Sequence, residues 1–362
     1  MNFRAVTLPE RPDPAELAAA SPLLAGPLAE AWTRNRHPYR PELLVADDGA
    51  LLVTHRPRTA QRKVAASAWR PGAGAAVVAA LVERMRESGI ARLVWEAPGR
   101  DAGGPAHSDD VDEVLEAAGF RRLRAPYASA PGTTGVAGWA LELVPLPHDE
   151  PPFYAQTTDF TCGAVTGLLV ANLLDADAGL TGRDRAVDRA TELAFWRRAT
   201  NFPAVDPLGL LVELARELPA EAALDAWISV DGPTLVEGVE PGFELETKEL
   251  LQRESAREAS ELGLPVRREW LSMERLRERV AEGARAIVLV DLVPMHDDPT
   301  PHWVLLHAVG DDVVLVQDPW LNAERGETWL DGHDLAIADD DFSAMARWGD
   351  PAYRAVVLVE RR

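Results

Sequence analysis

The chain has 362 residues, of which 47% are apolar and 26% charged, a composition that supports a folded core and excludes a disordered protein. Acidic side chains outnumber basic ones by 58 to 37, and the net charge of −21 argues against nucleic acid as a partner. The single cysteine, Cys162, excludes an internal disulfide and a cysteine-based zinc site. The length exceeds one ordinary domain and predicts two domains, or three.

Targeting signals and the common nucleotide and metal motifs do not occur in the sequence. No apolar run approaches the ~18 residues of a transmembrane helix, and residues 1–14 carry charges without the apolar stretch of a secretory signal. We therefore expect a cytoplasmic protein with no membrane partner. Neither of the two lysines, Lys63 and Lys248, follows a glycine, which excludes a Walker A loop.

The charge divides the chain. Residues 1–150 carry 17 basic and 19 acidic side chains, a net of −2, so residues 151–362 hold the remaining 20 and 39, a net of −19. The change falls within residues 145–152, where four prolines in eight residues indicate an extended linker. We predict two domains, over residues 1–147 and 148–362.

Short strands and helices alternate in the first half, as apolar periodicity and turn signals indicate. The elements expected are, in chain order, strands over 42–46 and 50–55, a helix over 75–88, a strand over 92–96, a helix over 109–118, and strands over 120–127 and 136–144.

This order resembles the GNAT acetyltransferase fold over about residues 40–145. The resemblance rests on Gly72-Ala73-Gly74-Ala75 opening a helix and on Ala118-Gly119-Phe120 beginning a strand. In that family a Gln/Arg-x-x-Gly-x-Gly/Ala loop holds the acetyl-CoA pyrophosphate at the helix N-terminus. Here Trp69 stands at the Gln/Arg position, and Pro71 removes a backbone donor. We expect a degenerate domain without a cofactor; acetyl-CoA binding is the less favoured alternative.

The second half opens with a segment that places Cys162 in the first turn of a helix. Val165, Leu168 and Leu169 have helical spacing, and Thr161 is one of several residues that can cap the helix. A helix N-terminus favours the thiolate form of a cysteine. The alternative is a small buried hydrophobic residue. Gln156, six residues earlier, can fold back and donate to an oxyanion beside the sulfur.

A histidine and an aspartate follow on two paired strands. Residues 301–309 predict a strand that begins with His302, and a hairpin turn leads to a second strand ending at Asp318. A three-residue loop would pair Val304 with Asp318 and set His302 diagonally from it on the same face. A two-residue turn would place them on opposite faces unless a bulge intervened. His307 alternates to the other face, where we expect a packed or surface residue.

A cysteine on a helix, followed by histidine and aspartate on paired strands, is the order found in papain-like cysteine peptidases. More narrowly, the segments around Cys162, His302 and Asp318 resemble the bacteriocin-processing (double-glycine leader) peptidase family, and in particular relatives with an N-terminal GNAT-like domain. The resemblance covers about residues 150–362. It implies that Cys162 is the nucleophile, His302 the general base and then acid, and Asp318 the residue that orients the imidazole. Gln156 would line the oxyanion hole.

We therefore expect an α+β chain, with a GNAT-like α/β domain followed by a papain-like peptidase domain. Its expected function is a thiol hydrolase that cleaves an amide bond in a peptide or protein, with no cofactor and no metal. Two alternatives stay open: an acyl transferase on the same triad, and a binding or regulatory protein with both domains catalytically silent. The acidic second half predicts a preference for cationic or neutral peptides.

Residues 296–298, His-Asp-Asp, together with His302 form the best alternative for a metal site. Pro299 and Pro301 make this stretch rigid and extended, so an acidic loop beside the cleft is the favoured interpretation. The remaining elements expected in the second half are a charged helix over 244–260, a helix over 273–282, and strands over 286–292 and 353–360.

Overall fold

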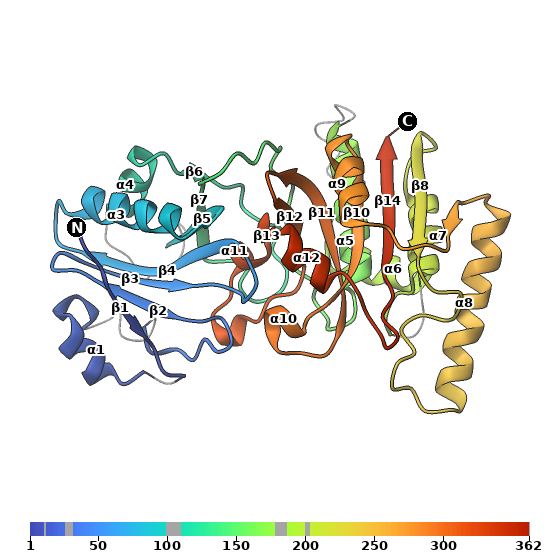
Figure 1. The fold of residues 1–362 in the computed structure, drawn as a ribbon, viewed down its shortest axis with the longest axis horizontal. Helices are drawn as coiled ribbons and strands as arrows, with labels where there is room; N and C mark the ends of the chain where they lie inside the picture. The colour runs from blue at the N-terminus through green and yellow to red at the C-terminus, as the bar shows by residue number, and fades with distance from the viewer. Residues whose placement is uncertain (11, 26–31, 99–109, 178–186, 200–202, 362) are drawn as a thin grey trace.

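A computed structural model describes the chain except for residues 11, 26–31, 99–109, 178–186, 200–202 and 362. Two seven-stranded sheets follow one another along the longest axis of the molecule (Figure 1). The first is built from residues before the proline-rich segment and the second from residues after it. Residues 145–161, between them, form no helix or strand. The predicted domain limits at 147 and 148 stay a prediction.

The first sheet has the order β1-β2-β3-β4-β5-β7-β6, in which β4 and β5 run parallel and the other neighbours antiparallel. Its strands are β1 (Arg4–Thr7), β2 (Glu42–Val45), β3 (Gly49–Thr54), β4 (Gln61–Trp69), β5 (Arg92–Pro98), β6 (Arg121–Arg122) and β7 (Val136–Glu142). Helices α3 (Gly74–Glu87) and α4 (Val111–Ala117) cover one face, and α1 (Pro14–Ala20) with η1 (Pro22–Leu24) covers the other.

Two differences from the predicted elements have physical causes. The strand predicted over 120–127 is only two residues long, because Arg124 donates its backbone N–H to the Glu150 side chain and Pro126 has none to give. The sequence did not predict β4, which begins with polar residues that are buried against the second half of the chain. Residue 109, the predicted start of a helix, lies outside the described residues.

Trp69 ends β4 and points into the core of the first half. Its side chain is buried, its ring packs edge-on against Trp95, and its indole N–H donates to Asp110 at 2.7 Å. A Cβ atom on Gly74, at the start of α3, would lie 2.9 Å from the Trp69 ring. The residue that replaces Gln/Arg in the GNAT pattern therefore fills the space beside the glycine loop.

The second sheet has the order β13-β12-β11-β10-β14-β8-β9, antiparallel except for the pair of β8 and β9. Its strands are β8 (Ala222–Ile228), β9 (Val266–Arg267), β10 (Arg285–Asp291), β11 (Pro301–Gly310), β12 (Val313–Gln317), β13 (Leu335–Ala338) and β14 (Ala355–Arg361).

Helices cover both faces of this sheet. Ile287 and Leu289 of β10 pack toward α5 (Cys162–Asp177), α6 (Arg189–Ala199) and α7 (Pro207–Glu217). Val288 and Val290, on the alternate face, pack toward α9 (Met273–Ala281) and α12 (Asp339–Met345). The long helix α8 (Phe243–Glu261) lies against α7 at the far end of the molecule (Figure 1). The α+β class predicted from the sequence is confirmed.

Two short helices stand near the junction of the two sheets, α10 (Val293–His296) and α11 (Trp329–Gly332). Lys63 of β4 is buried there between the carboxylates of Glu96 and Asp331. Gln61 donates to the carbonyl of Leu330 at 2.9 Å. Buried polar contacts of this kind fix one sheet against the other. In the part of the chain that is described, no helix is both long and apolar enough to cross a membrane.

Candidate active site

Cys162 is the first residue of α5, as its predicted place in the first turn requires. The helix is started by Thr161, whose carbonyl accepts the N–H of Val165 at 3.0 Å. A Cβ atom on Gly163 would lie 3.1 Å from the Trp303 ring, so only a residue without a side chain lets α5 approach β11 this closely. The Cys162 side chain is a free thiol at the edge of the core, 8% exposed.

Glu192 of α6 holds the segment that leads to the cysteine. Its fully buried carboxylate accepts the Tyr154 hydroxyl at 2.8 Å and the Thr157 N–H at 2.8 Å. It also accepts the hydroxyl of Thr161, directly before Cys162. One carboxylate thus ties three points of an irregular segment and fixes where the helix begins.

The hairpin of β11 and β12 follows the second of the two alternatives, a two-residue turn with a bulge. Gly310 pairs with Val313, so the turn has two residues and not three. A bulge between Leu306 and Ala308 then shifts the register by one residue, and Leu305 pairs with Gln317. The next step along both strands is the predicted alignment of Val304 with Asp318. His307 is the extra residue of the bulge, and its side chain is buried.

This register brings His302 and Asp318 together. The Nε2 atom of His302 lies 2.7 Å from Oδ1 of Asp318, which also accepts the backbone N–H of Trp320 at 2.9 Å. Both side chains are buried. The Cys162 sulfur lies near enough to the imidazole to raise its pKa, and Nδ1 is the ring nitrogen that Asp318 leaves free. The three residues therefore stand in the order cysteine, histidine, aspartate.

The electrostatics of this set favour a charged imidazole. Burial alone would lower the pKa of His302, but the Asp318 carboxylate and the Cys162 sulfur together raise that pKa to about 10. Burial would raise the pKa of Asp318, but Arg56 and His302 hold it well below its usual range. Asp318 is thus ionised and pairs with an imidazole that keeps its proton well above neutral pH.

Arg56, from the loop between β3 and β4, provides a cation on the other side of Asp318. Its Nη1 donates to Oδ2 of Asp318 at 2.6 Å, and its Nε donates to Glu327 at 2.7 Å. Its Nη2 donates to the carbonyl of Trp320 at 2.8 Å. The guanidinium is fully buried, and the two carboxylates outweigh burial and raise its pKa. The first half of the chain therefore contributes a side chain to this site.

His296 of α10 lies beside the same carboxylate. Its Nε2 is 3.9 Å from Oδ2 of Asp318, and its Nδ1 is 3.1 Å from the hydroxyl of Tyr39. Burial and the positive charge of Arg56 lower the pKa of His296, which keeps it neutral. Within the described residues, no three His, Cys, Asp or Glu side chains are arranged to hold a metal ion. The residues 296–298 instead turn the chain before β11.

Gln156 lies beside the loop that carries Asp318. Its backbone N–H donates to the carbonyl of Pro319 at 2.8 Å, and its side-chain amide donates to the carbonyl of Thr158 at 2.7 Å. Its buried side-chain oxygen has no hydrogen-bond partner among the described residues. The amide keeps a second N–H. Its role as an oxyanion donor stays a prediction.

Arg56 and Glu192 of the site were not among the predicted residues. Arg56 lies 262 positions from Asp318 and 271 from Glu327, and nothing in its loop distinguishes it from a solvated arginine. Glu192 shows only as an acidic residue in a helix, and its partners lie 31 to 38 positions earlier. Complementary burial of an arginine and two carboxylates would have been the signal, and it is visible only in three dimensions.

Comparison with known proteins gives a family for the second half of the chain. Solved structures similar in fold are found for each half. A C39-like peptidase from Bacillus anthracis is 13% identical, with a TM-score of 0.31, over 59% of this chain and 99% of its own. The Escherichia coli ribosomal-protein-S18-alanine N-acetyltransferase is 16% identical, with a TM-score of 0.27, over 41% and 97%. An N-acetyltransferase from Staphylococcus aureus is 10% identical, with a TM-score of 0.25, over 40% and 99%.

None of the curated proteins matches the chain. The model of the Peptidase_C39 like family matches residues 151–360, which is more than half of the sequence. This match confirms the resemblance predicted for the second half. The chain with Cys162, His302 and Asp318 in this arrangement belongs to the Peptidase_C39 like family.

Proposed function

We propose that the protein is a thiol hydrolase that cleaves an amide bond in a peptide or protein. The observation that carries the proposal is the position of His302, buried between the Cys162 sulfur and the Asp318 carboxylate. An imidazole held at both ends has a fixed ring orientation and proton location, as nucleophilic thiol catalysis requires. Family membership supports the same chemistry.

Each residue has a step in the proposed reaction. The Cys162 thiolate, its proton held by His302, attacks the carbonyl carbon of the scissile amide and places negative charge on the carbonyl oxygen. Gln156 donates a hydrogen bond to that oxygen. His302 then gives its proton to the departing amine, the C–N bond breaks, and a thioester to Cys162 remains. Water, deprotonated by His302, hydrolyses the thioester and releases the acid and the free thiol.

Asp318 supports these steps without changing its own protonation. Its charge stabilises the imidazolium that exists before attack, and its hydrogen bond keeps Nδ1 of His302 directed at sulfur. The free cysteine suits a reducing compartment, so we place the reaction in the cytoplasm.

The test is hydrolysis of a mixed peptide library by the wild type and by Cys162→Ala, read by mass spectrometry. We expect products from the wild type, none from Cys162→Ala, and the same melting temperature for both within ~1 °C. Since the chain has one cysteine, any thioester adduct must sit at Cys162. Equal product from both proteins, or none from either across the library, would refute the proposal.

The same measurement separates the alternatives of the acyl transferase and the silent protein. Addition of a primary amine diverts the thioester to an amide product if transfer is the reaction, and leaves acid as the product if hydrolysis is. A silent protein forms no adduct at all. Because residues 151–362 carry most of the negative charge, we expect cationic and neutral peptides to be cleaved faster than acidic ones.

A further inference from the structure

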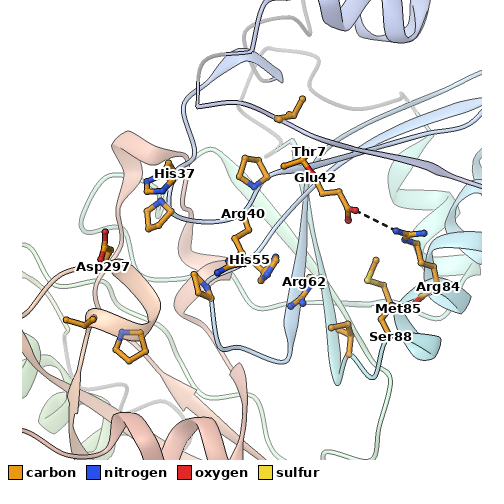
Figure 2. A pocket seen from close by; sticks show the side chains of 17 residues that line it. Thr7, His37, Arg40, Glu42, His55, Arg62, Arg84, Met85, Ser88 and Asp297 are labelled. Atoms are coloured by element: carbon orange, nitrogen blue, oxygen red, sulfur yellow. Dashed lines mark hydrogen bonds and ion pairs between the residues drawn. The ribbon is translucent and has the colours of Figure 1, made fainter.

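A pocket of about 730 Å³ lies between the first sheet and α10 (Figure 2). Its walls come from both halves of the chain, with Arg40, His55 and Pro57 on one side and Val293 and Pro294 on the other. A volume of this size suits a small organic molecule. The proposed reaction uses none of the residues that line this pocket.

The pocket is rich in positive charge, in a protein whose net charge is −21. The basic residues that line it are Arg40, Arg62, Arg84, His37 and His55. Arg84 lies 3.6 Å from Glu42, the contact drawn in Figure 2. Arg40 and Arg62 have no carboxylate within ion-pair distance among the described residues, and the other acidic residue of the wall, Asp297, stands at the opposite end (Figure 2).

Arg40 and Arg62 lie close enough to repel each other, and both act on His55, which is neutral. Burial, then Arg62 and Arg40, lower the pKa of His55 to about 3. Burial also lowers the pKa of Arg62 to about 10, with Arg40 adding to the effect and Glu42 opposing it. Among the described residues, Glu42 is the one carboxylate near these two guanidinium groups, and it also contacts Arg84. The remaining positive charge therefore favours an anion between Arg40 and Arg62.

Much of the remaining lining is apolar and rigid. Pro38, Pro41 and Pro57 come from the first half and Pro294 from the second, and Met85 also lines the pocket, near Arg84 and Ser88 (Figure 2). Prolines fix the backbone, so the shape of the pocket is set before a ligand arrives. An apolar wall beside a charged centre fits an organic anion better than a bare ion.

We propose that this pocket binds a small organic anion, with a phosphate or carboxylate group between Arg40 and Arg62 and an apolar body against the prolines and Met85. The pocket also lies next to two residues that contact the candidate active site. Tyr39 and Arg56, the buried residues next to pocket-lining neighbours, contact His296 and Asp318 respectively. The two segments are joined by the bond from the His55 N–H to the Tyr39 carbonyl, 3.0 Å.

An anion in the pocket would therefore steady the two segments that carry Tyr39 and Arg56, and through them the Asp318 carboxylate. This effect on the triad rests on the proposed function, whereas binding itself does not. Binding and effect are consequently measured separately.

The binding test is calorimetric titration of the full chain with phenyl phosphate, benzoate and phenol. The matched variants are Arg40→Gln, whose side chain forms no hydrogen bond or ion pair among the described residues, and Arg70→Gln, a mostly exposed arginine of the same half outside the pocket. We expect saturable binding of one anion and none of phenol, weakened about tenfold by Arg40→Gln and unchanged by Arg70→Gln.

No saturation by either anion below about 10 mM, or equal weakening in both variants, would overturn the proposal. The anion that saturates identifies phosphate or carboxylate as the recognised group. For the effect on the triad, we expect the saturating anion to change the rate of Cys162 alkylation by iodoacetamide at least about twofold in the wild type and not in Arg40→Gln. An unchanged rate overturns the effect on the triad and leaves the binding result standing, whether or not any peptide is cleaved.

Discussion

Arg56 donates to one oxygen of the Asp318 carboxylate at 2.6 Å while His302 binds the other at 2.7 Å. The arginine comes from the first sheet and the histidine and aspartate from the second. A carboxylate held from both sides cannot rotate away from the imidazole without losing a buried ion pair. The geometry of the proposed triad therefore depends on contact between the two halves of the chain.

Replacing Arg56 by Gln should leave Asp318 and Glu327 buried without their shared cation. Loss of one partner from a buried pair costs about 3–5 kcal/mol, and we expect a lower melting temperature and at least a tenfold fall in kcat/KM. The matched control is Arg58→Gln, on the same loop, whose side chain is 68% exposed and which should change neither quantity.

The pH profile distinguishes this positioning role from general destabilisation. Arg56 helps to keep the pKa of Asp318 low, so its removal raises that pKa. Asp318 would then become protonated at a higher pH, and the acid limb of kcat/KM against pH should move upward. An unmoved acid limb in a variant that is still folded would contradict the role assigned to Arg56.

The reactivity of Cys162 should depend on His302 even without a known substrate. The pKa of His302 is raised to about 10, so the imidazole is protonated at neutral pH and lies beside the Cys162 sulfur. We expect iodoacetamide to alkylate the wild type rapidly below pH 7. In His302→Gln the rate should follow an ordinary thiol, half-maximal near pH ~8.5. Identical profiles for the two proteins would rule out the ion pair.

Asp334 is a second buried carboxylate at the junction of the two halves. Its oxygens lie 3.1 Å from Nε2 of His148 and 3.1 Å from Nε2 of His307, and Gln317 donates to it at 2.8 Å. Burial would raise the pKa of Asp334, but His333, His148 and His307 hold it well below its usual range. The carboxylate is ionised and joins the linker to the second sheet.

Asp334→Asn should therefore destabilise the protein by about 3 kcal/mol near pH 5.5. A lowered aspartate pKa contributes stability in full above the unfolded value of ~3.9, and this is lost as pH falls through the folded value. The raised pKa of His148 contributes in full below ~6.5, and this is lost as pH rises through its folded value. The difference in melting temperature between wild type and variant should thus be largest between pH ~3.9 and pH ~6.5, the two unfolded-state pKa values.

The exposed neighbour Asp340 provides the control for that series, and Asp340→Asn should leave the melting temperature unchanged at every pH. If the difference in melting temperature between wild type and Asp334→Asn were constant from pH 3 to pH 9, ionisation of Asp334 would contribute nothing to the stability of the junction.

Trp69 should block cofactor binding in the first half. Its ring fills the space beside Gly74, where the related pattern holds acetyl-CoA, so calorimetry with acetyl-CoA should show no saturation below about 1 mM. Because Trp69 is also buried, Trp69→Ala should cost about 3–5 kcal/mol of stability in chemical unfolding. Saturable heat from the wild type would overturn the degenerate interpretation of this domain.

The sequence was sufficient to single out the residues of the proposed triad because each has a local signature. Cys162 opens an apolar helix, His302 begins a strand, and Asp318 follows the paired strand. Of the two turns considered between those strands, the structure has the two-residue turn, with a bulge at His307 that shifts the register by one residue. The shorter turn and the bulge each shift the strand pairing by one residue in opposite directions, so Val304 still aligns with Asp318.

What the sequence could not predict lies where the halves meet. The polar start of β4, with Gln61 and Lys63, breaks the alternation expected of a buried strand, because its partners lie on α11. Arg56 could not be recognised from the sequence because its partners, Asp318 and Glu327, also lie in the second half of the chain. Side chains that are satisfied by a distant segment look like surface residues until that segment is in place.

The buried position of Lys63 gives the protein a chemical reporter. The chain has only one other lysine, Lys248, so amine-directed reagents have few sites to modify. The Lys63 ammonium is 2% exposed, between Glu96 of its own half and Asp331 of the other. Acylation of Lys63 requires the halves to move apart, and its rate relative to that of Lys248 therefore measures how often the two halves of the protein separate.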